Sequence, residues 1–181
     1  MNGLINIGNT CYLNSALQFI LNVDEIVNFI IKNKNTTPIM NILYNFTNKY
    51  INSNNSTLNP SELKSYIGSK KDIFNNFNQQ DSSEFIIYLF DIINDELKKN
   101  NLNLNINKKL NLHLTTSIKC KRMKCLNESN VISKELFLFL SYEENLTDSY
   151  RLYKENEKLD EENKYMCESC NKKTIARKKI V

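Results

Sequence analysis

The stretch GLINIGNTCYLNSALQ, residues 3–18, decides the fold of this chain. It begins as a glycine-bearing loop and continues into a segment whose apolar residues recur at helical spacing, namely Leu13, Ala16, Leu17, Ile20 and Leu21. Asn9 or Thr10 can cap the start of that helix. Cys11 is therefore expected in the first helical turn.

This position of Cys11 suits a nucleophile. Unpaired backbone N–H groups and the positive end of the helix dipole favour a thiolate, which is the form that attacks a carbonyl. The side-chain amide of Asn6 could fold back over the site and, with the backbone N–H of Cys11, hold the oxyanion of a tetrahedral intermediate. The alternative is a buried structural cysteine at a helix start.

The whole run resembles the cysteine box of the ubiquitin-specific proteases, which reads roughly Gly-Leu-x-Asn-x-Gly-Asn-Thr-Cys-Tyr-x-Asn-Ser-x-Leu-Gln. Every fixed position of that pattern is filled, from Gly3 through Gln18. The resemblance implies that Cys11 is the nucleophile of a thiol protease and that Asn6 is its oxyanion-hole residue. The implied reaction is hydrolysis of the bond after the C-terminal glycine of ubiquitin.

Composition restricts the class of protein. The chain has 181 residues, 41% of them hydrophobic, which is enough for one domain with a core, and no run is long enough to span a membrane. No signal peptide is evident, and a net charge of +4 does not by itself indicate nucleic acid. One isolated cysteine and two pairs suit a reducing compartment. We expect an intracellular protein of the cytoplasm or nucleus.

The first part of the chain, residues 1–105, is predicted to be helical. Apolar residues recur at helical spacing over 24–31, after Thr37-Pro38, and after Asn59-Pro60 as far as Gly68, and we assign these stripes to core packing. Residues 98–109 are polar, and Leu102, Leu104 and Ile106 alternate, which predicts a loop that runs into a weak strand.

Asp81 and Glu84 open the next predicted helix. Their three-residue spacing is that of a capping box. Gln79-Gln80-Asp81 and Glu84-Phe85 also match the second signature of the ubiquitin-specific proteases. The resemblance implies that Asp81 and Glu84 help to receive the arginine-bearing C-terminal tail of ubiquitin. Capping and tail binding are compatible, because a cap uses only some of the carboxylate lone pairs.

The second part, residues 106–181, changes to strand periodicity. Leu110, Leu112 and Leu114 alternate, and 131–142 is predicted as a strand with apolar residues on both faces. Residues 146–159 are expected to form a charged helix capped by Thr147 or Asp148. A basic strand is expected over 174–181.

Four of the five cysteines form two pairs with the spacing of zinc ligands. Cys167 and Cys170 have two residues between them, and Cys120 and Cys125 have four. The alternative is four free or disulfide-forming cysteines. The pairs resemble those that bracket the fingers strands of the ubiquitin-specific proteases, where they hold structural zinc; the wider first spacing departs from that pattern.

A cysteine hydrolase also needs a base. The single histidine, His113, lies in an alternating strand without the Gly-His-Tyr setting of the family, and we interpret it as a solvent-facing residue. The resemblance thus implies an α+β, papain-like cysteine protease of the ubiquitin-specific type, with a helical thumb, β fingers and an incomplete palm. A fragment, a split enzyme completed by a second polypeptide, or a degenerate ubiquitin binder would each explain this pattern. The chain alone is expected to be inactive or nearly so.

Two functions other than deubiquitination remain open at this point. A non-catalytic ubiquitin-binding module would have no use for a complete cysteine box. A zinc-finger nucleic-acid binder could use the basic residues around the cysteine pairs, namely Lys121, Arg122, Lys124, Lys172 and Lys173. The low net charge makes nucleic acid the least favoured partner, and ubiquitin or a ubiquitinated protein the favoured one.

Overall fold

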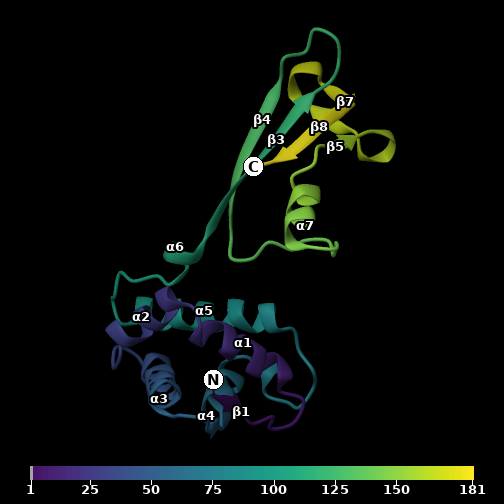
Figure 1. Ribbon diagram of the computed structural model, residues 1–181. Helices are drawn as coiled ribbons and strands as arrows, with labels where there is room; N and C mark the ends of the chain where they lie inside the picture. Colours follow the sequence, from purple (N-terminus) through teal and green to yellow (C-terminus); the bar gives the residue numbers. More distant parts are fainter. Residues whose placement is uncertain (1) are drawn as a thin grey trace. The chain divides into compact units, whose positions relative to one another are not determined.

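The computed structural model describes residues 2–181, except for the side chain of Lys109, and divides the chain into two compact units between Leu110 and Asn111 (Figure 1). The first unit is almost entirely helical, and the second consists mostly of antiparallel strands. The α+β class expected from the sequence is therefore confirmed. Within the described residues, no helix has both the length and the apolar character needed to cross a bilayer.

Over its described residues, 2–110, the first unit contains six α-helices, one 3₁₀ helix and one short parallel strand pair. They are β1 (Gly3–Leu4), α1 (Cys11–Leu21), α2 (Asp24–Lys32), α3 (Pro38–Asn52), β2 (Thr57–Leu58), α4 (Ser61–Lys70), η1 (Asp72–Phe74), α5 (Ser82–Lys99) and α6 (Asn107–Leu110).

The core of this unit is formed by the apolar stripes that the sequence places at helical spacing. Leu13, Leu17 and Ile20 of α1 are at most 1% exposed. An aromatic group of Tyr12, Phe74 and Phe85 joins α1, η1 and α5, with ring centroids 5.3–5.9 Å apart. Contacts of this kind stabilise a core beyond the area they bury.

Partly buried side-chain hydrogen bonds anchor the segment before the cysteine loop. The Nδ2 of Asn2 donates to the backbone oxygen of Ser53, and its Oδ1 accepts from the N–H of Ser56. The Nε2 of Gln18 donates to the backbone oxygen of Asn2, while its Oε1 accepts from the hydroxyl of Tyr50. Gln18 thereby ties α1 to both the N-terminal strand and α3.

Glu96 is a buried carboxylate on α5 that the sequence pattern does not reveal. It is 9% exposed; its Oε2 accepts from the backbone N–H of Ile39 at 3.2 Å, and its Oε1 accepts from the hydroxyl of Tyr66. Ile39 lies in the first turn of α3, so the carboxylate caps that helix from another part of the chain. Burial, followed by the bond to Glu96, raises the pKa of Tyr66 to about 12, so the hydroxyl keeps its proton at neutral pH.

Replacement of this carboxylate is expected to weaken the first unit. Glu96→Ala removes two hydrogen bonds to a charged group and should lower the free energy of unfolding by about 3 kcal/mol. Tyr66→Phe removes only one of them and should have about half that effect. Urea unfolding followed by circular dichroism measures both. Equal effects of the two variants would show that the bond to Ile39 contributes nothing.

The second unit contains two antiparallel sheets and a short helix. Its elements are β3 (Leu112–Cys120), β4 (Glu128–Glu135), α7 (Leu146–Tyr153), β5 (Glu157–Leu159), η2 (Glu161–Asn163), β6 (Tyr165–Cys167), η3 (Glu168–Cys170), β7 (Lys172–Thr174) and β8 (Ala176–Ile180). The larger sheet has the order β4-β3-β8-β5 (Figure 1), and a separate pair is formed by β6 and β7.

Several element boundaries differ from the prediction. The strand expected around 102–106 is absent from the described chain, and α6 follows this stretch. The strand expected over 131–142 is β4, which ends at Glu135, because its partner β3 begins opposite that residue at Leu112 and residues 136–142 are left without a paired strand. Alternation alone cannot reveal where a partner strand stops.

Two helix boundaries were also predicted wrongly. α4 does not end at Gly68 but continues to Lys70; a Cβ at Gly68 would lie 3.2 Å from the backbone of Phe74 and Asn75, so this glycine permits close packing of η1. α7 is capped by the Asn145 side chain, which accepts from the N–H of Asp148, and it ends at Tyr153. Residues 157–159, expected in that helix, form strand β5 instead.

Candidate active site

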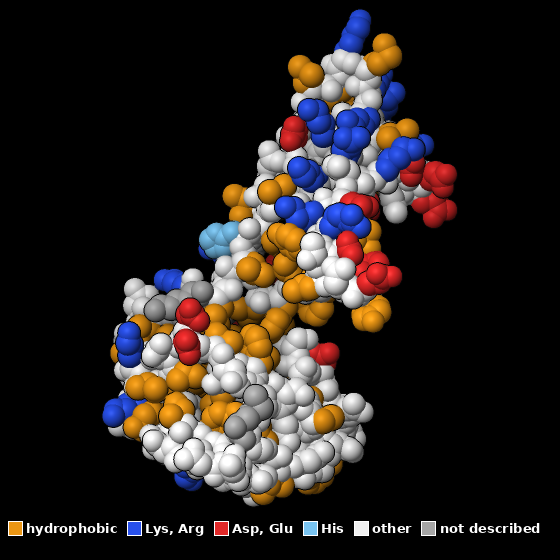
Figure 2. Space-filling view, in the orientation of Figure 1, with side chains coloured by type: hydrophobic (Ala, Val, Ile, Leu, Met, Phe, Trp, Pro, Cys, Tyr) orange, Lys and Arg blue, Asp and Glu red, His pale blue; other side chains and the backbone are white. Residues whose placement is uncertain are grey.

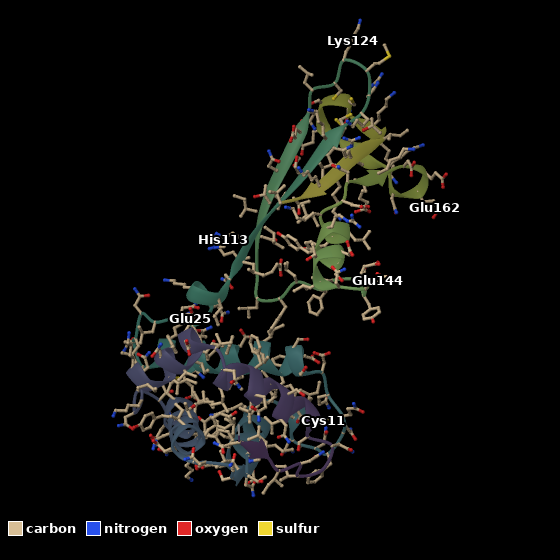
Figure 3. The ribbon with its side chains drawn as sticks, viewed as in Figure 1. Cys11, Glu25, His113, Lys124, Glu144 and Glu162 are labelled. Atoms are coloured by element: carbon tan, nitrogen blue, oxygen red, sulfur yellow. The ribbon has the colours of Figure 1, made fainter. Side chains whose placement is uncertain are left out.

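Cys11 is the first residue of α1 and its side chain is exposed (Figure 3). Thr10 occupies the N-cap position, but its hydroxyl makes no cap: it accepts from the N–H of Ile7 at 3.0 Å and donates to the Oδ1 of Asn6 at 3.0 Å. The first-turn N–H groups beside Cys11 therefore lack a side-chain cap from Thr10. Such groups attract negative charge.

The side-chain amide of Asn6 is held in one orientation by the loop. Its Oδ1 accepts from the backbone N–H groups of Gly8 (3.2 Å) and Thr10 (3.1 Å) as well as from the Thr10 hydroxyl. Since all three partners are donors, the oxygen must face them. Among the described residues, the Nδ2 of Asn6 has no hydrogen-bond partner, and Asn6 itself is exposed. The amide can thus donate to an oxyanion, as an oxyanion-hole residue must.

The turn between Asn6 and Cys11 is fixed by positive φ angles and by the segment 75–80. Gly8 has φ +100° and Asn9 has φ +48°. The positive φ of Gly8 favours glycine there, and a Cβ at this position would also come within 3.0 Å of the Phe77 ring. The Nδ2 of Asn9 donates to the backbone oxygen of Phe77 at 2.9 Å.

The first turns of α1 and α5 adjoin each other. Tyr12, next to Cys11, packs against Phe85, next to Glu84, with ring centroids 5.7 Å apart. Burial and then the neighbouring Cys11 raise the pKa of the Tyr12 hydroxyl. The structure therefore brings the predicted nucleophile and the predicted acidic pair into one helical unit.

Asp81 caps α5 as predicted. Its Oδ1 accepts from the backbone N–H groups of Ser83 (2.7 Å) and Glu84 (2.9 Å) and from the Ser83 hydroxyl. The Ser83 hydroxyl, followed by the Glu84 N–H, lowers the pKa of Asp81. In the part of the chain that the structure describes, neither Oδ2 of Asp81 nor the carboxylate of Glu84 has a hydrogen-bond or ion-pair partner, so both can receive a cation. The reciprocal bond of a capping box, from Glu84, is not formed.

The charge of Asp81 should make the stability of α5 depend on pH. Its pKa is lowered on folding, so the stabilisation is complete above its ordinary value near 4 and is lost as the pH falls through the lower folded value. Asp81→Ala should therefore lower the free energy of unfolding by about 1 kcal/mol at pH 7, and by less in strong acid. Urea unfolding at pH 7 and pH 3 measures this difference. Asp81→Asn, which keeps an acceptor oxygen, should reduce the pH dependence of the free energy of unfolding; a dependence as large as that of the original chain would contradict the assignment.

The two cysteine pairs meet in the second unit. The Sγ atoms of Cys120, Cys125, Cys167 and Cys170 all lie within 4.8 Å of one another, and those of Cys125 and Cys167 are 3.7 Å apart. Tetrahedral zinc with Zn–S bonds of about 2.3 Å requires sulfur atoms about 3.8 Å apart. The four thiols could therefore hold a metal ion, and the wide spacing between Cys120 and Cys125 does not prevent it. All are free thiols.

Neighbouring polar groups lie within hydrogen-bonding distance of these sulfur atoms. The Thr174 hydroxyl lies 3.3 Å from the Sγ of Cys120, and the Nδ2 of Asn127 donates to the Sγ of Cys167 at 3.5 Å. The bond from Thr174, followed by the backbone N–H of Arg122, lowers the pKa of the Cys120 thiol to about 6. Sequence reasoning missed Thr174 because it lies outside both cysteine motifs.

Loss of the Thr174 hydroxyl should weaken metal binding. Thr174→Val keeps the shape of the buried side chain but removes the O–H···S bond, and we expect about a tenfold lower zinc affinity, as for other supporting hydrogen bonds around metal ligands. Competition with a chromophoric chelator measures the affinity. Thr174→Ser restores a hydroxyl and should bind zinc nearly as tightly as the original chain; equal weakening by both would assign the effect to packing.

His113 is exposed on β3, where it pairs with Lys134 of β4, as expected for a solvent-facing strand residue (Figure 3). It belongs to the second unit, whereas Cys11 belongs to the first. No other histidine occurs in the sequence.

Comparison with known proteins finds ubiquitin carboxyl-terminal hydrolases. "Probable ubiquitin carboxyl-terminal hydrolase 16" of Schizosaccharomyces pombe is 26% identical over 197 residues, which cover 98% of this chain and 43% of the relative. "Ubiquitin carboxyl-terminal hydrolase 25" of Arabidopsis thaliana is 28% identical over 98% of the chain and 31% of its own length. "Ubiquitin carboxyl-terminal hydrolase Usp2" of Drosophila melanogaster is 32% identical over 58% of the chain and 12% of its own length.

The chain thus spans less than half the length of these relatives. The family model described as ubiquitin carboxyl-terminal hydrolase matches residues 2–177, which is nearly all of the sequence and includes the cysteine loop, the start of α5 and all four clustered cysteines. This chain belongs to the ubiquitin carboxyl-terminal hydrolase family.

Proposed function

We propose that the chain provides the nucleophile and an oxyanion donor of a cysteine-type deubiquitinase. The observation that carries the proposal is the pairing of an exposed Cys11 at the start of α1 with an Asn6 amide whose oxygen is occupied and whose Nδ2 is available. The names of the matched relatives support the reaction class, which is hydrolysis of the bond after the C-terminal glycine of ubiquitin.

In the proposed reaction, the Cys11 thiolate attacks the carbonyl carbon of that glycine. The negative charge that forms on the carbonyl oxygen is stabilised by the Nδ2 of Asn6 and by the first-turn N–H of Cys11. Departure of the amine leaves an acyl-enzyme, which water then hydrolyses. Asp81 and Glu84 attract the cationic tail of ubiquitin, and the proximity of Tyr12 to Phe85 supports their placement beside the nucleophile.

The leaving amine must receive a proton, and a general base or acid typically contributes 10²–10⁴-fold to the rate. We propose that another part of the enzyme or a second polypeptide supplies this group, because residues 1–110 contain no histidine. The chain by itself should therefore react with an electrophile faster than it turns over a substrate.

The proposed role of the cysteine cluster is to hold structural zinc; no catalytic cofactor is required by this chemistry. The partners are ubiquitin and ubiquitinated proteins. Five free thiols support a reducing compartment, so we propose that the protein acts in the cytoplasm or nucleus.

The test is an intact-mass measurement after incubation of the zinc-loaded chain with ubiquitin that carries a C-terminal electrophile. We expect one adduct, which is lost in Cys11→Ala and retained in Cys125→Ser if the first unit stays folded. An adduct that survives in Cys11→Ala would overturn the assignment of the nucleophile. Ubiquitin binding without any adduct would assign the chain to the non-catalytic binding class.

A further inference from the structure

A row of three like charges crosses the four-stranded sheet of the second unit. Arg177 of β8 lies directly opposite Lys119 of β3 on one side and Lys158 of β5 on the other. Directly opposed residues of antiparallel strands project from the same face, so all three cations share one face of the sheet. In Figure 2, many Lys and Arg side chains gather on the visible face of the second unit.

The charge of this row is only partly neutralised. Lys119 pairs with Glu128 at 3.7 Å and Lys158 pairs with Asp160 at 2.7 Å, both at exposed positions where ion pairs contribute little. Arg177 has no ion pair among the described residues. Like charges directly opposite each other destabilise a sheet. Repulsion of this kind between neighbouring strands is often found where the charged residues bind a ligand.

A cavity of about 300 Å³ lies at this row, lined by Lys121, Asn156, Lys158, Ile175, Ala176 and Arg177. Its volume is at the lower end of the range for small-molecule sites. Strand alternation places Lys179 on the same face as the row, and Lys121 lines the cavity, so the part of the face around the row carries five cations against the two carboxylates of Glu128 and Asp160.

We propose that this cavity binds a diphosphate group. The excess of three positive charges matches the charge of a diphosphate near neutral pH. Arg177 offers a planar fork that binds phosphate oxygens in pairs, while Lys121 and Lys158 act as mobile point charges. Asn156 adds an uncharged donor. The site is separate from Cys11 and does not rest on the proposed deubiquitinase function.

A compact anion fits better than a nucleic-acid strand. Single-stranded nucleic acid is held by aromatic side chains on which bases stack, as well as by a basic groove. The residues that line this cavity include no aromatic side chain. Ile175, Ala176 and the aliphatic stems of the basic residues supply the apolar part of its lining.

The experiment is isothermal titration calorimetry of the zinc-loaded chain with pyrophosphate, beside sulfate at equal ionic strength. We expect pyrophosphate to bind at least about tenfold more tightly than sulfate. Arg177→Gln should weaken pyrophosphate at least about tenfold. Lys134→Gln is the matched control, because this exposed lysine of β4 lies on the same face of the sheet but away from the cavity. It is six residues, or about 20 Å, along β4 from Glu128, which is the residue opposite Lys119. It should leave the affinity unchanged.

Arg177→Lys and Lys121→Gln are milder substitutions that test whether weaker pyrophosphate binding comes from the site itself or from loss of folding. Arg177→Lys keeps the charge but not the fork and should give an intermediate affinity, and zinc content measured after each titration shows that the cluster is intact. Equal binding of sulfate and pyrophosphate, or equal weakening by Lys134→Gln and Arg177→Gln, would overturn the proposal. Displacement of pyrophosphate by a 20-nucleotide single strand at a lower concentration of phosphate groups would overturn it in favour of nucleic acid.

Discussion

Removal of zinc from the zinc-loaded chain is expected to unfold residues 111–181 and to leave the helices of residues 2–110 in place. The second unit buries very few side chains: among its described residues these are Cys120, Ser149, Cys167, Thr174 and Ala176. Two of the five are candidate metal ligands, and a third, Thr174, lies within hydrogen-bonding distance of one of them. A unit with so small a core needs a further source of stability, and structural zinc supplies about 10–16 kcal/mol in small zinc-binding peptides.

Two-dimensional amide NMR spectra before and after chelation measure this effect separately for the two units. The resonances of β3 and β8 should collapse into the unfolded range, whereas those of α1 and α5 should not move. Cys125→Ser should reproduce the effect of the chelator, and Cys11→Ser, which alters the cysteine outside the cluster, should not. A spectrum of the second unit that is unchanged by metal removal would show that its strands are stable without a metal.

Asn6→Asp is expected to leave the cysteine loop folded and to weaken capture of a tetrahedral adduct about 10²-fold or more. The substitution keeps an oxygen for Gly8 and Thr10, so the three hydrogen bonds that shape the loop can persist. It removes the Nδ2 donor and places a negative charge beside the developing oxyanion. Asn6→Ala, in contrast, removes both the loop bonds and the donor.

Ubiquitin with a C-terminal aldehyde is the suitable probe, because its reaction with Cys11 forms a tetrahedral adduct that resembles the intermediate. The affinities of the original chain, Asn6→Asp and Asn6→Ala are measured for this probe and, as a control, for unmodified ubiquitin. The comparison separates stabilisation of the oxyanion from binding of ubiquitin. Unmodified ubiquitin should bind the original chain and the Asn6→Asp variant, which both retain the loop, with similar affinity. If Asn6→Asp captures the aldehyde as well as the original chain does, Asn6 is only a structural residue of the loop.

The elements that the sequence predicts well are those determined locally. The start of α3 follows from Thr37-Pro38, and the start of α5 follows from Asp81, because a cap and the helix that it begins are neighbours in the chain. The apolar stripe of α1 gives its buried face directly. Cys11 and Asn6 could be proposed for the same reason, since one short segment carries both.

The features that the sequence does not predict depend on residues distant in the chain. Glu96 looks like an ordinary helical glutamate, and only the packing of α5 against α3 and α4 reveals its bonds to Ile39 and Tyr66. The end of β4 depends on where β3 begins. The row of Lys119, Arg177 and Lys158 appears only once the register of three strands is known.

The hydrogen bond from Asn9 to the backbone of Phe77 has a thermodynamic consequence for catalysis. It joins the loop that carries the nucleophile to the segment that precedes Asp81. A ligand that is bound by Asp81 and that favours the present conformation of residues 75–80 would also favour the present conformation of residues 6–11. Linkage requires the converse as well: an adduct on Cys11 should tighten the hold on a tail at Asp81 by the same factor. Binding of the tail at Asp81 and the conformation of the loop that carries Cys11 would then be governed by a single conformational equilibrium rather than by two independent ones.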